Sequence, residues 1–171
     1  VKELQGMGIQ PDIIVCRSEY PLDNGIKDKI ALFCNVPSSH VLQNLDVEYL
    51  YEAPLAMEEE HLAQVACECL GLPCPEPNLS DWKAMCTALK HPKGEVSVAL
   101  VGKYTQLHDA YISVVESLKH GGIANGVSVN IKWVDSEKVT AENVEEFLGD
   151  VSGIIVPGGF GDRGIEGMIQ S

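Results

Sequence analysis

The sequence predicts an α/β protein in which parallel sheets with flanking helices form two incomplete domains joined by a proline-rich linker. Short apolar runs at 13–16, 96–101 and 153–156 are of the continuous kind that forms strands buried on both faces. Segments with helical spacing follow these runs, and alternating strands and helices are typical of parallel sheets. Three prolines within residues 73–77 exclude regular structure there, which predicts the linker.

Composition excludes several classes of protein. The chain has 171 residues, of which 45% are hydrophobic and 22% charged, and this excludes wholesale disorder. Its formal net charge of −13 disfavours attraction to nucleic acid or anionic lipid, so we expect neither as a partner. No apolar run long enough for a membrane span and no signal peptide are visible, and we expect a cytoplasmic protein. The chain begins at Val1 without methionine, and we expect it to be a fragment.

The first domain is expected over residues 1–72. After the strand at 13–16, helical spacing predicts a helix over 26–33 that packs Ile30, Leu32 and Phe33 and ends before Pro37. A less regular stretch is expected as far as Tyr51. A helix over 58–70 then follows, with an acidic first turn at 58–60 and Gly71 as its C-terminal cap.

The linker is expected over 73–93 and the second domain over 94–171. Ser80 and Asp81 open a helix that runs to Lys90 inside the linker. The second domain then alternates between strand and helix. Its strands are expected at 95–101, 127–134 and 153–156, and its helices at 107–120, where Gly121 and Gly122 stop the turn, and at 141–148. Ligands of such a sheet bind beyond the carboxyl ends of its strands.

The six cysteines are spread through apolar segments, and we interpret them as buried thiols. A zinc set could be drawn from Cys67, Cys69, Cys74 and His61. Two cysteines one residue apart on a helix point to different faces, however, and no C-x-x-C occurs, so we expect no metal site.

A glycine-rich loop follows the last predicted strand, and three interpretations of it stay open. Residues 159–164 match G-x-G-x-x-G, which would indicate a dinucleotide-binding oxidoreductase domain. That fingerprint normally follows the first strand of its domain rather than the third. The loop could also be a turn without a ligand role. We favour a rigid turn whose backbone amides face a reacting carbonyl as part of an oxyanion hole.

Several segments together give the chain a resemblance to the CTP synthases of bacteria. They are Gly8–Asp12, Lys29–Val36, Val101–Tyr104, Leu118–Gly122 and Val156–Gly164, in the expected order and at the expected intervals. The resemblance implies a glutamine-hydrolysing ligase of pyrimidine nucleotide biosynthesis, which makes CTP from UTP, ATP and ammonia derived from glutamine. It further implies an amidoligase domain that ends in residues 1–72, a class I glutamine amidotransferase domain that begins in 94–171, and a homotetramer.

The resemblance also assigns roles to substrate-binding residues of this chain. Gly159 is implied to bind glutamine and to support the oxyanion hole, and Lys29 is implied to contact UTP or the product CTP. Asp46 and Val47 match a segment that lines the adenine of ATP. A solvated helix lysine at position 29 and a plain strand end at 46–47 remain the simpler alternatives.

The remaining implications concern the effector, the cofactors and the catalytic residues. Phe160 and Arg163 are implied to bind the activator GTP, by stacking and by charge, although a core aromatic and a surface arginine are close rivals. ATP and Mg²⁺ are implied cofactors, and no metal ligand is expected in this chain. The family's catalytic cysteine, histidine and glutamate and its phosphate-binding loop have no match here, so we expect the isolated chain to be inactive.

Overall fold

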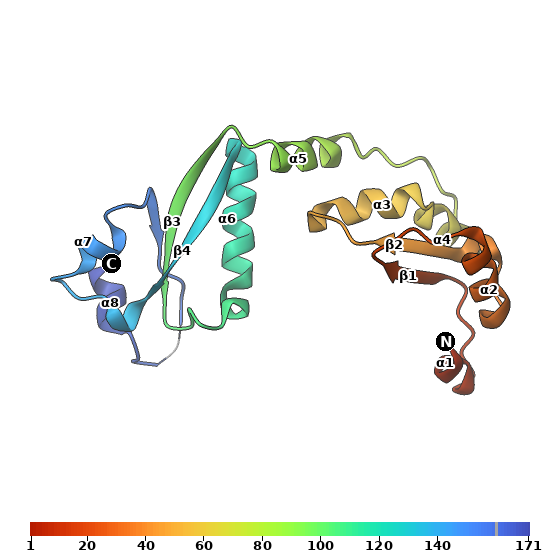
Figure 1. The fold of residues 1–171 in the computed structure, drawn as a ribbon, viewed down its shortest axis with the longest axis horizontal. Coiled ribbons are helices and arrows are strands. Elements are labelled where there is room, and N and C mark those ends of the chain that lie inside the picture. The colour runs from red at the N-terminus through yellow and green to blue at the C-terminus, as the bar shows by residue number, and fades with distance from the viewer. Residues whose placement is uncertain (160) are drawn as a thin grey trace. The chain divides into compact units, whose positions relative to one another are not determined.

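The computed structural model describes residues 1–159 and 161–171. These form two compact units, Val1–Lys83 and Ala84–Ser171, each of which is treated by itself below (Figure 1). The division between the units falls within the stretch expected to be the linker, and the expected domain boundaries remain a prediction. Within the described residues, no helix combines the length and the apolar character that crossing a membrane requires.

A two-stranded parallel sheet lies at the centre of the first unit. β1 (Ile14–Ser18) pairs with β2 (Val41–Leu45) in a register that runs from Ile14 opposite Val41 to Ser18 opposite Leu45. β1 confirms the predicted strand, whereas β2 lies in the stretch expected to be irregular. Polar residues interrupt its apolar pattern, and one of them, Gln43, accepts a hydrogen bond from the backbone N–H of Leu22 at 2.9 Å. This strand is therefore defined by contacts with distant residues.

Helices surround this small sheet. They are α1 (Lys2–Gly6), α2 (Asn24–Cys34), α3 (Ala53–Glu59), α4 (Leu62–Leu70) and α5 (Ser80–Lys90), with 3-10 turns at Ser38–His40 and Leu50–Glu52. α2 begins where the Asp23 carboxylate accepts a hydrogen bond from the N–H of Ile26 at 2.8 Å. The expectation that Leu32 and Phe33 pack was wrong, because both are exposed within this chain while Ala31 is buried.

The helix expected over 58–70 is broken into α3 and α4. The break lies at His61, whose φ of 60° is left-handed and cannot continue a helix. The neighbouring Glu60 is held by three hydrogen bonds. Its carboxylate accepts from Lys27 Nζ at 2.9 Å, from the Gln43 N–H at 3.0 Å and from Gln43 Nε2 at 2.9 Å. Glu60 therefore lies between two helices and not in the acidic first turn that the sequence predicted.

Glu60 makes the stability of this unit sensitive to acid. Burial raises the pKa of the Glu60 carboxyl, but the hydrogen bonds from Gln43 and Lys27 outweigh burial and hold the pKa below its ordinary value of 4.5. Stabilisation from a depressed carboxyl pKa is present above the unfolded-state pKa and is lost as pH falls through the folded-state pKa. We expect Glu60→Gln to lower the free energy of unfolding by about 1–2 kcal/mol at pH 7.

Urea unfolding of the wild-type and variant chains at several pH values measures this effect. The difference between them is expected to shrink as pH falls below 4.5. Glu59→Gln, at the exposed neighbouring position, is the matched control and is expected to change stability by less than about 0.5 kcal/mol. A difference for Glu60→Gln that is the same at pH 7 and at pH 3 would contradict the prediction.

The second unit is built on a three-stranded parallel sheet in the order β4-β3-β5. β3 is Gly94–Gly102, β4 is Val127–Asp135 and β5 is Gly153–Ile155. Gly102 lies opposite Asp135, and Leu100 lies opposite Ile155, so the carboxyl ends of all three strands meet at one edge. The three predicted strands and their parallel arrangement are confirmed.

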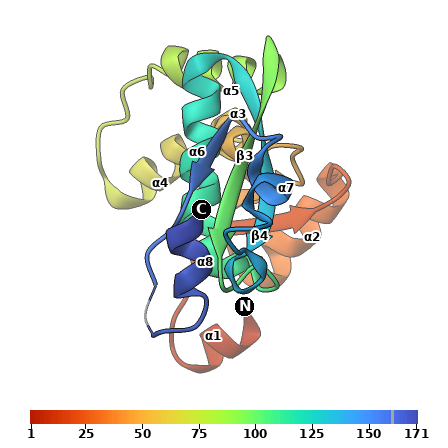
Figure 2. The same ribbon diagram turned by 90° about the vertical axis from the view of Figure 1, so that its left-hand side faces the viewer.

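Helices cover both faces of this sheet. α6 (Ile112–Asn125) lies along one face, and α7 (Val144–Leu148) and α8 (Ile165–Gln170) lie on the other (Figures 1 and 2). Short 3-10 turns occur at His108–Tyr111 and Ser136–Lys138. The core on the α7 side consists of Ala99, Val101, Val134, Val139 and Leu148. Because both faces are covered, the carboxyl half of β3 is fully buried, which explains its continuous apolar sequence.

α6 runs through the two glycines that were expected to stop it and ends at Gly126, whose φ is 68°. Gly122 is buried against β4. A Cβ atom at this position would lie 2.7 Å from the carbonyl oxygen of Val127 and 2.7 Å from Val129 Cγ2, whereas one at Gly121 would have nothing within 4 Å. Gly122 therefore permits close packing of the helix on the strand and does not end the helix.

This contrast predicts opposite effects for the same substitution at adjacent positions. Gly121→Ala is expected to raise the free energy of unfolding by up to about 1 kcal/mol, because alanine favours a helix over glycine. Gly122→Ala is expected to lower it by about 1–3 kcal/mol, because the added methyl group must displace backbone atoms of β4. Thermal or urea unfolding of the two variants measures both values. Two changes of the same sign would show that the helix–strand contact is looser than described.

Candidate functional site at the carboxyl edge of the three-stranded sheet

Three loops meet where β3, β4 and β5 end. β3 continues into Lys103–Thr105, β4 into the 3-10 turn Ser136–Lys138, and β5 into the glycine-rich segment that precedes α8. In open parallel sheets this edge is where ligands bind, and the sequence placed the candidate loops here. The side chains described below connect the three loops to one another.

Lys103 is the central residue of this edge. It follows the buried strand β3 and is itself only 7% exposed. Its Nζ donates a hydrogen bond to the carbonyl oxygen of Gly161 at 3.1 Å. Its backbone N–H donates to Tyr111 Oη at 3.1 Å, so the loop is also anchored to the start of α6. The buried ammonium thus ties the end of β3 to the glycine-rich loop.

Arg163 completes this connection in the opposite direction. Its guanidinium donates to the carbonyl oxygen of Lys103 at 3.1 Å, forms an ion pair with Glu137, and lies 5.4 Å from the centre of the Tyr104 ring. Arg163 therefore contacts the loops after β3 and β4 while lying in the loop after β5. Its charge is paired, and its side chain remains about half exposed.

Gly159 is exposed at the same edge. A Cβ atom built on it would lie 3.1 Å from Lys103 Cε, so its backbone passes directly beside the lysine stem. The structure thus brings together Gly159 and Arg163, which the sequence analysis selected. Phe160, the other residue expected to bind an effector, lies outside the described residues.

Ser136 supports the loop from below. It is 1% exposed, and within the described part of the chain its Oγ has no hydrogen-bond partner. Gly164 and Gly167 both pack directly against this residue, and side chains at either glycine would collide with it. Small residues at these positions allow the glycine-rich loop and α8 to lie close to the end of β4.

The site residues expected in the first unit lie at two places. Lys29 is exposed on α2. Asp46 follows β2 and forms an ion pair with Arg17 at 2.9 Å, and its backbone N–H donates to the Ser18 carbonyl at 3.2 Å. Val47 is half-buried next to it. No hydrogen bond or ion pair in the described residues joins Lys29 to Asp46, and the expected nucleotide roles of these three residues stay predictions.

Three residues of these sites were not selected from the sequence. Lys103 could have been noticed as a lysine directly after a buried strand, at the edge where ligands bind. Arg17 and Glu137 carried no comparable signal, because their partners Asp46 and Arg163 are 29 and 26 residues away in the chain. Among the described residues, no group of three or more histidine, cysteine, aspartate or glutamate side chains could hold a metal ion. We therefore assign Mg²⁺ no ligand in this chain.

Sequence comparisons identify the two units separately. Residues 1–72 match the family model described as CTP synthase N-terminus, and residues 106–171 match the model described as glutamine amidotransferase class-I. The second match includes the whole glycine-rich loop. It supports the oxyanion-hole interpretation of that loop, and none of the matches supports a dinucleotide-binding domain.

Curated relatives match the chain over its full length. CTP synthases of Ruminiclostridium cellulolyticum and Clostridium acetobutylicum are each 57% identical to it over 171 residues, which are 100% of this chain and 32% of theirs. The CTP synthase of Symbiobacterium thermophilum is 54% identical, with the same coverage. The chain thus spans about a third of the length of these relatives. It belongs to the CTP synthase family and carries the passage from the family's N-terminal domain into its class I glutamine amidotransferase domain.

Proposed function

We propose that this chain is part of an enzyme that makes CTP from UTP, ATP and ammonia released from glutamine. Residues 1–72 would belong to the amidoligase domain, 73–93 to the linker and 94–171 to the amidotransferase domain. The observation that carries this proposal is the 57% identity to CTP synthases over the whole chain. The connected loops at the sheet edge, where an amidotransferase domain would hold glutamine, support it independently.

On the glutamine side, the chain would contribute binding and polarisation. Hydrolysis of the glutamine amide places negative charge on its carbonyl oxygen, and a fixed backbone N–H near that oxygen stabilises the charge. We assign this N–H to Gly159, with Lys103 holding the loop in place. The nucleophile that attacks the amide would come from another part of the enzyme, since a polarised carbonyl still requires an activated attacking group.

The effector role of Arg163 would involve an exchange of partners. Its guanidinium is paired with Glu137 and stacked near Tyr104. Bound GTP would offer phosphate oxygens and an aromatic base, which are the groups that arginine binds best. In this proposal GTP replaces Glu137 as the partner of Arg163 and adds a contact from Phe160.

On the nucleotide side, Lys29 would contact UTP or CTP, and Asp46 and Val47 would line the adenine of ATP, which acts together with Mg²⁺. The exposed ammonium of Lys29 is free to meet a triphosphate. Asp46 reaches the same sheet edge as Arg17, so their ion pair would shape the adenine site. The proposal includes a cytoplasmic homotetramer that binds neither nucleic acid nor membrane.

The role of Lys29 predicts a selective defect. In the parent enzyme, Lys29→Ala is expected to raise the UTP concentration needed for half-maximal rate by about tenfold, because a charged contact to the triphosphate is lost. Glutamine hydrolysis in the presence of GTP is expected to stay unchanged, since that reaction occurs in the other domain. Initial-rate assays with varied UTP measure the effect, and unaltered UTP dependence would return Lys29 to a solvated helix lysine.

The proposed function is tested by comparing this chain with a longer protein that contains it. The longer protein is expected to form CTP from UTP, ATP, Mg²⁺ and glutamine, and to accept ammonia in place of glutamine. The 171-residue chain alone is expected to give no CTP and no glutamate above background. Reproducible glutamate release by the isolated chain would contradict the assignment of the nucleophile to another part of the enzyme.

A further inference from the structure

The C-terminal end of α4 brings two cysteines of the linker region together. Gly71 ends the helix with a φ of 64°, and the chain then turns back. The backbone N–H of Leu72 donates to the carbonyl of Cys67 at 2.9 Å, and that of Gly71 donates to Glu68 at 3.2 Å. This paired capping pattern reverses the chain direction at a helix end. Cys74 is thereby carried back toward the last turns of α4.

The two thiols are in contact. A side-chain hydrogen bond joins Cys74 to Cys67, and both cysteines are free. Cys67 is half-buried on α4, whereas Cys74 is exposed, so the expectation that the cysteines are buried thiols was wrong for Cys74. Prolines on both sides of Cys74 restrict its backbone, which limits how far the thiol can move from Cys67.

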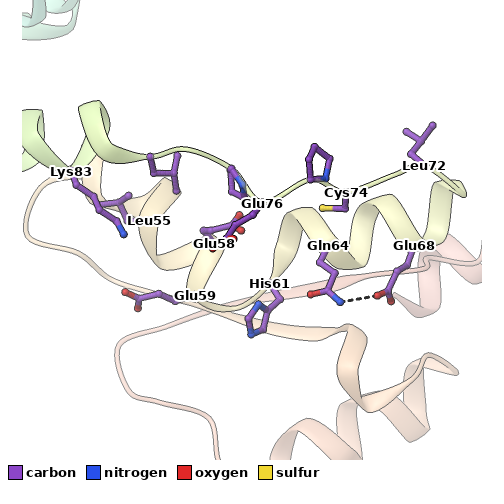
Figure 3. A pocket seen from close by; sticks show the side chains of 13 residues that line it. Leu55, Glu58, Glu59, His61, Gln64, Glu68, Leu72, Cys74, Glu76 and Lys83 are labelled. Carbon is purple, nitrogen blue, oxygen red and sulfur yellow. Dashed lines mark hydrogen bonds between the residues drawn. The ribbon is translucent and has the colours of Figure 1, made fainter.

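The thiol pair borders an acidic pocket of about 650 Å³. Figure 3 shows Cys74 beside the helix that carries Gln64 and Glu68. The charged and titratable side chains that line the pocket besides Cys74 are Glu58, Glu59, His61, Glu68, Glu76 and Lys83. Partial desolvation raises the pKa of the Cys74 thiol, and the hydrogen bond to Cys67 and the negative charges of Glu58 and Glu68 raise it further.

We propose that Cys67 and Cys74 form an oxidation site at which an intramolecular disulfide fastens the start of the linker to α4. The oxidant is a small-molecule disulfide. The exposed Cys74 thiolate attacks it, forms a mixed disulfide and releases one thiolate of the reagent. Cys67 then attacks Cys74 Sγ, the protein disulfide forms, and the reagent leaves as a dithiol. Two protein thiols have lost two electrons and two protons, and one reagent disulfide has been reduced.

The acidic pocket sets the rate of this reaction. A thiolate is the attacking species, and the raised pKa of Cys74 keeps its thiolate scarce near neutral pH. The pair therefore follows the thiol–disulfide balance of its surroundings slowly and is unsuited to rapid peroxide sensing. Oxidation is expected to accelerate as pH rises, and also when Glu58 and Glu68 are made neutral.

The test uses the fully reduced 171-residue chain at pH 7.5, equilibrated with known ratios of oxidised and reduced dithiothreitol, native and in 8 M urea. After acid quenching and alkylation, a protease that cleaves after glutamate separates Cys67 from Cys69 at Glu68. Mass spectrometry is expected to find a peptide pair that links Cys67 to Cys74, with two hydrogens fewer than the free peptides. The equilibrium constant for this bridge is expected to be at least roughly tenfold larger in the native chain than in urea.

Variants assign the bridge and its environment. Cys74→Ser is expected to abolish it, and Cys69→Ser, on the same helix, is expected to leave it unchanged. The double variant Glu58→Gln and Glu68→Gln is expected to oxidise at least about threefold faster at pH 7.5. No bridge, a bridge from Cys74 to Cys69, or an equal equilibrium constant in urea would each overturn the proposal. An unchanged rate in the double variant would overturn the role given to the acidic pocket.

Discussion

Gly159→Pro is expected to lower glutamine-dependent CTP formation in the parent enzyme by about two orders of magnitude or more. Proline removes the backbone N–H that we assign to the oxyanion hole, and loss of one such donor has an effect of this size. Gly159→Ala keeps the N–H but places a methyl group 3.1 Å from Lys103 Cε. Because the lysine stem can shift, we expect a smaller loss for alanine than for proline.

The control for Gly159 is the source of nitrogen. With ammonium salt in place of glutamine, both variants are expected to make CTP at the wild-type rate, since ammonia bypasses the glutamine site. Rates of CTP formation and of glutamate release are measured side by side. If ammonia-dependent synthesis fell as far as glutamine-dependent synthesis, Gly159 would have a structural role in place of the proposed one.

Lys103→Met is expected to reduce glutamine hydrolysis in the parent enzyme by about tenfold to a hundredfold. Methionine retains a flexible apolar stem but removes the ammonium that donates to the Gly161 carbonyl. Small displacements of a positioning group have effects of this size on catalysis. In the isolated chain, the amides of residues 161–164 are expected to exchange hydrogen with solvent faster in the variant, which a change of global stability alone would not confine to this loop.

Ammonia-dependent CTP formation again separates the roles of Lys103, and it is expected to be unchanged by Lys103→Met. A folded Lys103→Met enzyme with wild-type glutamine hydrolysis would contradict the positioning role. Equal acceleration of exchange throughout Ala84–Ser171 would indicate that Lys103 contributes to general stability and not to the placement of the loop.

Local patterns were sufficient where a segment makes its own strongest interactions. The buried strands at β3, β4 and β5 were predicted from continuous apolar runs, and α5 was predicted with the bounds that it has, because a cap and a helical pattern lie within a few residues of each other. The cap at Gly71 was predicted for the same reason. The glycine-rich loop was selected as the functional edge because it directly follows a strand of a parallel sheet.

The sequence by itself thus determined the α/β class, the three parallel strands of the second unit and the family. Tertiary structure alone decided where α3 breaks from α4, because Glu60 is drawn to Lys27 and Gln43. It also decided that α6 continues through Gly122, which fits against β4. The Lys103–Gly161 and Arg163–Glu137 contacts arise in the same way. Each depends on residues distant in the chain, whose attraction acts only after folding has brought them together.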